Sequence, residues 1–101
     1  MKDVLITVTG LSFRYGSDFL KKGMKVKLVK EPDNECDNEA IRVELKGLGH
    51  IGYVANSAKT VCGECLSAGR LYDKIGKKAK AKVVHKLDNA VICKVSKDSL
   101  K

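Results

Sequence analysis

The sequence has little of what secreted, membrane-spanning or disulfide-rich proteins need. It contains one proline, no tryptophan and 5% aromatic residues. No apolar run reaches membrane-spanning length, and residues Met1–Thr9 lack the apolar core and small-residue cleavage site of a secretory signal. We therefore expect a cytoplasmic protein. Without a secretory segment, the four cysteines should remain reduced thiols.

The sequence also lacks the residue patterns of the common enzyme classes. It has no glycine-rich phosphate-binding loop, and neither His50 nor His85 lies near a serine or cysteine in a nucleophile context. No pair of carboxylates stands in an evidently apolar setting. We predict no catalytic residues and no cofactor, so a binding module is favoured over an enzyme.

The Cys62-Gly63-Glu64-Cys65 segment matches half of a zinc site. Zinc would require two further ligands, for which the other two cysteines and the two histidines are the available sources. The alternative is that Cys62 and Cys65 belong to the apolar stripe of a helix together with Val61 and Leu66. The core interpretation is favoured, so the main prediction is that the protein binds no metal. Metal binding by Cys62 and Cys65 is the weaker alternative.

The charge of the chain favours an anionic partner. Twenty Lys and Arg residues against twelve Asp and Glu residues give a formal net charge of +8. Such a surface attracts polyanions and binds them with release of counterions, so nucleic acid is the leading partner class and no membrane contact is expected. Five lysines lie within residues Lys74–Lys82, a pattern typical of a solvated strand face. The alternative is that the lysines only keep the protein soluble.

Alternating apolar and polar residues predict a mainly β (α+β) fold. Gly23 should end a short helical turn that Ser17 caps, Asn56 or Ser57 should cap a main helix, and Gly69 should stop that helix. The antiparallel strands should form a small, partly open barrel of the OB or SH3-like type. Residues 1–101 should make one domain. The predicted strands cover residues 4–9, 24–30, 40–45, 50–54, 80–87 and 90–95, and the main helix covers 58–67.

Two further stretches look suited to binding. Residues Glu31–Val43 contain the only proline and the only cluster of acids; Pro32 should make a stiff corner between two strands, with polar side chains pointing outward. Phe13, Arg14 and Tyr15 lie in a less regular loop, where aromatic rings beside a guanidinium make a plausible platform for a base or ribose. The structural alternative is that they close one end of the barrel.

The chain resembles the HIRAN domain family. The resemblance covers about residues 4–70 and depends on Gly10, on Glu31-Pro32-x-Asn34-x-x-Asp37-x-x-Ala40-Ile41-x-Val43, and on Gly49-x-Ile51-Gly52-Tyr53-Val54. HIRAN domains occur alone in bacteria and phages, and at the N-terminus of Snf-type DNA translocases involved in replication-fork repair. The resemblance implies a small β-barrel that binds single-stranded DNA and recognises a free 3′-hydroxyl end, with a role in DNA repair.

The resemblance also implies roles for individual residues. Asp37 would accept a hydrogen bond from the terminal hydroxyl, and Asn34 would help to order the pocket. Arg14 with Phe13 or Tyr15 would contact a phosphate and stack on a base, and Tyr53 would line the same cleft. Cys36 stands where end-binding members have an aromatic residue, which removes a stacking surface worth about 1–3 kcal/mol. Lys59 is the nearest cation after Tyr53-Val54, where the family has a basic residue.

The function expected from these observations is nucleic-acid binding, with single-stranded DNA favoured and 3′-end recognition in a basic cleft. The protein should be a monomer, and a larger helicase or nuclease is a further partner that the resemblance suggests. The alternative is a protein-interaction domain in which the acidic corner and the aromatic loop dock a partner chain.

Overall fold

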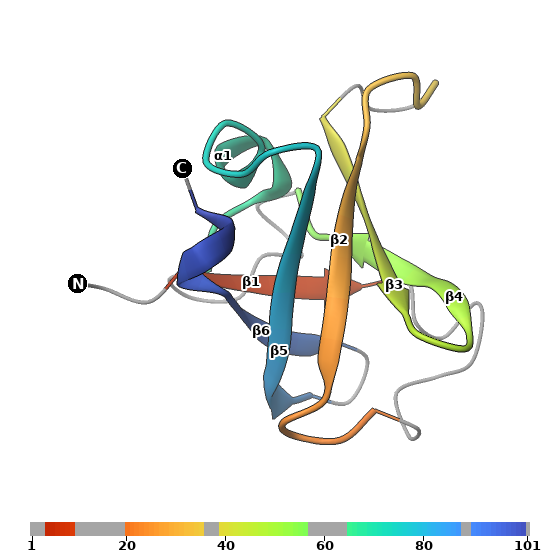
Figure 1. Ribbon diagram of the computed structural model, residues 1–101, viewed down its shortest axis with the longest axis vertical. Coiled ribbons are helices and arrows are strands. Elements are labelled where there is room, and N and C mark those ends of the chain that lie inside the picture. The colour runs from red at the N-terminus through yellow and green to blue at the C-terminus, as the bar shows by residue number, and fades with distance from the viewer. Residues whose placement is uncertain (1–3, 10–19, 36–38, 57–64, 88–89, 101) are drawn as a thin grey trace.

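Six β-strands close into a barrel in the computed structural model, which describes residues 4–9, 20–35, 39–56, 65–87 and 90–100 (Figure 1). The order around the barrel is β1-β4-β3-β2-β5-β6, and every neighbouring pair is antiparallel. The predicted antiparallel barrel is confirmed. It is closed rather than partly open, because β1 pairs with both β4 and β6. The strands are β1 (Leu5–Thr9), β2 (Lys25–Glu31), β3 (Ala40–Leu45), β4 (Gly49–Val54), β5 (Lys78–Lys86) and β6 (Val91–Val95).

The barrel interior is filled by the apolar side chains on the inward faces of the strands. In β5, Ala79 and Ala81 are buried between exposed Lys78, Lys80 and Lys82, so the predicted solvated lysine face is confirmed. Alternate positions point to opposite faces of a strand, which is why this lysine-rich segment still supplies a core face. The largest fully buried core side chains include Ile6, Leu20, Leu28, Ile41, Ile51 and Leu71.

Two bulges interrupt the ladders. Val43 pairs with Gly52 but Glu44 pairs with His50, which leaves Ile51 as the extra residue in β4. This bulge lies directly beside Gly52. A second bulge between β5 and β6 leaves Val84 unpaired. Bulges bend and twist a strand, and both help these short strands to curve into a closed barrel.

The proline corner forms a hydrogen-bonded turn at the end of β2. The Asn34 backbone N–H donates to the Glu31 carbonyl oxygen (3.1 Å), with Pro32 in the second position, where its fixed φ fits a β-turn. The predicted turn before β2 is described only at its end. There the Met24 N–H donates to the Lys21 oxygen (3.0 Å), and Gly23 has a φ of 95°, a conformation that favours glycine.

The helix prediction is wrong in the part that the structure describes. Residues 57–64 lie outside the described residues, but Cys65–Ser67 are not helical, and Leu66 instead bridges Ile6 of β1. Helix α1 runs from Ala68 to Tyr72, so Gly69 lies inside a helix rather than after one.

Two side chains determine where α1 begins. Ser67 is its N-cap, and the Ser67 hydroxyl accepts from the Arg70 N–H (3.3 Å). Asn56 accepts from the Gly69 N–H (2.8 Å), thirteen residues further along, and the helix start that it was expected to cap lies outside the described residues. Together they satisfy two of the N–H groups that a helix start leaves without intrahelical partners. A 3-10 helix, η2 (Lys97–Ser99), follows β6 and was not predicted.

The helices of the described segments are all short. None of them has the length and apolar character needed to cross a membrane.

Candidate nucleic-acid interface

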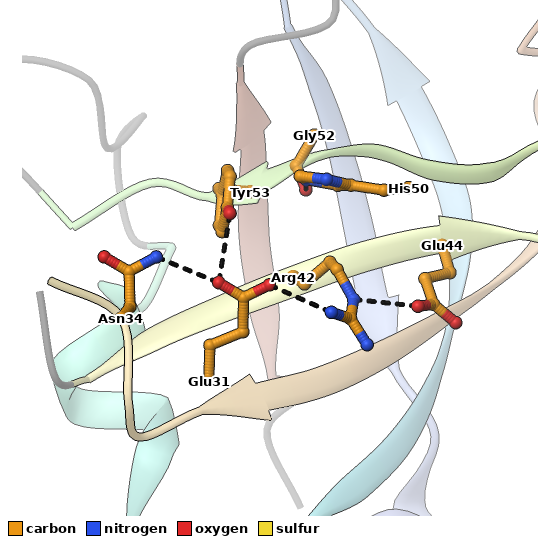
Figure 2. A network of polar contacts seen from close by, with 7 residues as sticks. All are labelled: Glu31, Asn34, Arg42, Glu44, His50, Gly52 and Tyr53. Atoms are coloured by element: carbon orange, nitrogen blue, oxygen red, sulfur yellow. Dashed lines mark hydrogen bonds and ion pairs between the residues drawn. The ribbon is translucent and has the colours of Figure 1, made fainter. Parts of the chain in front are cut away.

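A network of polar side chains surrounds the Glu31 carboxylate on the outer surface of β2, β3 and β4 (Figure 2). Glu31 Oε1 accepts from Asn34 Nδ2 (2.9 Å) and from the Tyr53 hydroxyl (3.0 Å), and Oε2 accepts from Arg42 Nη1 (3.1 Å). The three donors come from the proline corner, β4 and β3. Glu31 thereby ties the corner to the neighbouring strands.

Arg42 lies between two carboxylates. It pairs with Glu31 at 3.1 Å and, through Nε, with Glu44 Oε2 at 2.8 Å. The contact with Glu44 is an ion pair without hydrogen-bond geometry, and Nε has no hydrogen-bond partner among the described residues. All three side chains are partly exposed, at 32% for Arg42, 19% for Glu31 and 28% for Glu44. The network therefore faces solvent, and its two carboxylates outnumber its one guanidinium.

Two rings of β4 lie beside the network. His50 and Tyr53 make an edge-to-face contact with centroids 4.6 Å apart and an interplanar angle of 87°. His50 Nε2 is 3.0 Å from the Gly52 carbonyl oxygen, within hydrogen-bond distance. Edge-to-face packing and the hydroxyl bond to Glu31 fix the Tyr53 ring at both its body and its tip. Tyr53 is thus a preorganised, partly exposed aromatic residue that pairs across the strands with the cation Arg42.

The environment lowers the pKa of Glu31. Burial is the largest single influence and acts to raise this pKa, because a carboxylate loses hydration there. The hydrogen bonds from Asn34 and Tyr53, with the attraction of Arg42 and His50, together outweigh burial and bring the pKa below its ordinary value of 4.5. The carboxylate is therefore charged throughout the neutral range.

The lowered pKa predicts an acid-dependent loss of stability. A carboxylate whose folded-state pKa is depressed contributes stability above its unfolded-state pKa, and that contribution is lost as the pH falls through the folded-state value. Glu31→Gln should therefore be less stable than wild type at pH 7, and the difference in unfolding free energy between the two proteins should shrink as the pH falls below 4.5, the ordinary pKa of a glutamate. Urea unfolding across this pH range measures it. Glu35→Gln, an exposed position of the same corner, is the matched control; an equal response of both variants would contradict the prediction.

Comparison with known proteins identifies the family. The family model described as the HIRAN domain matches residues 1–95 of the chain. The chain belongs to the HIRAN family. The crystal structure of the HIRAN domain of human HLTF superposes with a TM-score of 0.62, at 18% sequence identity, over 92% of this chain and 72% of that one. This likeness confirms the fold. No curated protein matches the chain.

HIRAN domains are binding modules for nucleic acid, so membership makes nucleic-acid binding the functional class of this chain. Two of the residues predicted to form the site, Asn34 and Tyr53, come together on Glu31. Phe13, Arg14, Tyr15, Asp37 and Lys59 lie outside the described residues, so their predicted roles stay predictions.

Sequence reasoning missed the residues that hold this site together. Glu31 is part of the family pattern but has no role assigned from it, and Arg42 falls on a position that the pattern leaves open. The missing information is the register: Val29 pairs with Arg42 and Glu31 with Ala40. Only that offset places Arg42 diagonally across from Glu31, within reach of its carboxylate.

The cysteines are described in part. Cys62 lies outside the described residues, and Cys65 is partly buried. Burial, with a smaller contribution from nearby Cys65, raises the pKa of Cys93 to about 12, so this thiol is protonated and unreactive at neutral pH. The described residues contain no group of three or more His, Cys, Asp or Glu side chains arranged to hold a metal ion.

Proposed function

We propose that this HIRAN domain binds single-stranded DNA and holds a free 3′-hydroxyl end beside the Glu31 network. The observation that best supports the proposal is that Asn34 and Tyr53, which the family resemblance assigns to the pocket, share one carboxylate with Arg42. Asn34 is three residues from Asp37 in the chain, and its side chain and backbone are both bonded to Glu31. These bonds fix the position of Asn34, the described residue of the motif that comes before Asp37 in the chain.

The charge of the site favours a strand end over the middle of a strand. Glu31 and Glu44 leave the network with an excess of negative charge, although the whole chain is strongly positive. A phosphate brought here would be repelled by the carboxylates and would lose hydration without a full complement of donors. A terminal hydroxyl carries no charge and can donate to a carboxylate. Rejection of internal phosphates would thus contribute as much to end specificity as attraction of the hydroxyl.

Tyr53 provides the surface for the last base. Tyr53 is partly buried and its ring is held by His50 and Glu31, so little side-chain freedom is lost when a base stacks on it. Every base has a flat face, so stacking here would tolerate any sequence. The combination suits recognition of an end irrespective of its base.

The proposal is tested by changing the terminus and the residue assigned to it. Wild-type protein should bind a short single strand with a free 3′-hydroxyl more tightly than the same strand with a 3′-phosphate. Asp37→Asn should reduce that preference by about tenfold, because a hydrogen bond to a charged acceptor is replaced by a neutral one. Fluorescence anisotropy at low salt measures both affinities.

The control for this experiment is Asp33→Asn, which removes the same charge from an exposed position in the same corner. If Asp33→Asn lowers the preference for a 3′-hydroxyl as much as Asp37→Asn does, the effect comes from the general charge of the corner. The proposal that Asp37 recognises the strand end would then be wrong. Absence of any oligonucleotide affinity in the wild type at low salt would overturn the function itself.

A further inference from the structure

A second charged surface lies on the outer face of β2 and β5, away from the rings of β4. It is made of five exposed lysines, which we call the lysine face: Lys25 and Lys27 of β2, and Lys78, Lys80 and Lys82 of β5. The two strands run side by side at the front of the barrel in Figure 1. The side chains alternate with buried residues, so all five point to the same outer side.

The strand register brings like charges directly opposite each other. Lys25 pairs with Lys82 and Lys27 with Lys80, and on the other edge of β5 Lys82 pairs with Lys94 of β6. Like charges in directly opposed cross-strand positions destabilise a sheet. In the described part of the chain, none of the five lysines of the lysine face forms an ion pair. Solubility alone does not require such stacking, since the same charges could be spread over the surface.

The lysine face borders two open hollows. One is lined by Lys25, Lys80, Lys82 and Lys94 together with Lys97 and Asp98, and the other by Lys25, Lys27, Lys78, Lys80 and Ser99. Lys25 and Lys80 line both, so the hollows form one continuous concave strip. Asp98 is the only acid among these lining residues. A strip of this kind fits an elongated anion that passes over several lysines at once.

We propose that the lysine face is a second nucleic-acid surface, which binds the phosphate backbone of duplex DNA. None of the described residues that line the two hollows is aromatic, so these residues offer no ring on which an unpaired base could stack. Lysine is a point charge on a flexible stem and suits phosphate contacts without base readout. A duplex presents phosphates while hiding its bases, which matches this chemistry better than a single strand does.

An anionic membrane fits the same surface less well. Peripheral membrane sites combine cations with apolar side chains that enter the interface. The one large apolar side chain that is exposed in the described residues is Leu48, 42% exposed, in the turn between β3 and β4 rather than on the lysine face. The concave shape also opposes contact with a flat bilayer.

The lysine face meets the Glu31 network at one pair of residues. Lys27 lies directly opposite Glu44, which contacts Arg42. The outer surface thus changes from the carboxylate of Glu44 on β3 to the cation of Lys27 on β2 within one cross-strand step. The two surfaces have opposite charge, so they would bind different parts of a nucleic acid, and each can be tested without the other.

The test uses a dumbbell duplex, a double strand closed by a loop at each end and therefore without any 3′ end. Lys25→Gln/Lys80→Gln/Lys82→Gln should weaken dumbbell binding at least about tenfold at low salt and reduce the log-log salt slope by about 0.9 for each phosphate that is no longer neutralised. The matched control is Lys46→Gln/Lys74→Gln/Lys86→Gln, which removes the same charge from three exposed positions elsewhere. Its affinity for the dumbbell should fall much less.

Two further readouts keep the result interpretable. Thermal melting of the lysine-face variant should show no loss of stability, because the substitutions relieve repulsion between opposed lysines. In the wild type, the dumbbell should protect Lys80 and Lys82, but not Lys74 and Lys86, from acetylation.

The proposal would be overturned if the two triple variants weakened dumbbell binding equally, if the wild type did not bind the dumbbell, or if the dumbbell did not protect these lysines. The proposal would also be wrong if the lysine-face variant lost as much affinity for a single strand as for the dumbbell. Binding of the wild type to vesicles of anionic lipid, without binding to the dumbbell, would overturn it as well. Asp37→Asn should leave dumbbell affinity unchanged, so failure of either proposal leaves the other standing.

Discussion

Tyr53→Ala is expected to weaken binding of a single-stranded oligonucleotide by about 10- to 100-fold. Stacking of a base on an aromatic ring contributes about 1–3 kcal/mol. The Tyr53 ring is already fixed by His50 and Glu31, so little side-chain entropy remains to be lost on binding. Truncation removes the stacking surface together with one donor to Glu31. Fluorescence anisotropy with an unstructured strand at low salt measures the loss.

Tyr53→Phe separates the ring from the hydroxyl. It keeps the stacking surface and removes the 3.0 Å hydrogen bond to Glu31. We expect it to retain most of the affinity and to cost about 1 kcal/mol of stability, the usual net contribution of one hydrogen bond. A folded Tyr53→Ala protein that binds as tightly as wild type would show that no base stacks at this position. An equal loss in both variants would assign the effect to the hydroxyl and the order of the network.

The strands were predictable because apolar and polar residues alternate over much of their length. The first six residues of β5, 78–83, show this most clearly, since alanine or valine alternates with lysine there and leaves only one face that can be buried. Such a segment tolerates no shift by one residue, which would place lysines inside the barrel. Closure of the barrel was not predictable in the same way. It depends on β1 pairing on both edges, a long-range contact that no local pattern records.

The end of the predicted helix and the start of α1 were misplaced because two residues each fit more than one role. Gly69 was read as a helix stop, the commonest use of glycine near a helix end, but it occupies the second position of α1. Its N–H is satisfied by Asn56 from a distant part of the chain. Ser67 followed by Ala68-Gly69-Arg70 carried the correct N-cap signal, and the glycine masked it.

The site residues that the family pattern names could be predicted from the sequence. The residues that join the site only through contacts between strands could not. Asn34 and Tyr53 were found because the motif includes them. Arg42 and Glu44 were not, since their part in the network follows from the cross-strand offset between β2 and β3 and from the bulge between Val43 and Glu44. A sequence pattern fixes which residues are present but leaves open which side chain meets which across a barrel.

Glu31→Ala is expected to have the largest effect on stability of any change at the site. Glu31 accepts from three donors, on the corner, β3 and β4, and truncation leaves all three without this acceptor. Hydrogen bonds to a charged group contribute about 1.5–3 kcal/mol, and water partly replaces them at a partly exposed site, so a total loss of about 2–3 kcal/mol is expected. For a domain of this size the melting temperature should fall by on the order of 10 °C.

Glu44→Ala is the matched control for this change. It removes a carboxylate from the same arginine, but Glu44 has one partner among the described residues, in a partly exposed ion pair, and such pairs contribute about 1 kcal/mol or less. Urea unfolding of both variants at neutral pH gives the comparison. If the two cost the same, Glu31 acts as one member of a surface ion pair, and the corner is held by its proline and backbone turn alone. If Glu31→Ala costs more and also weakens oligonucleotide binding while Glu44→Ala does not, the carboxylate that orders the corner is also the one that orders the site.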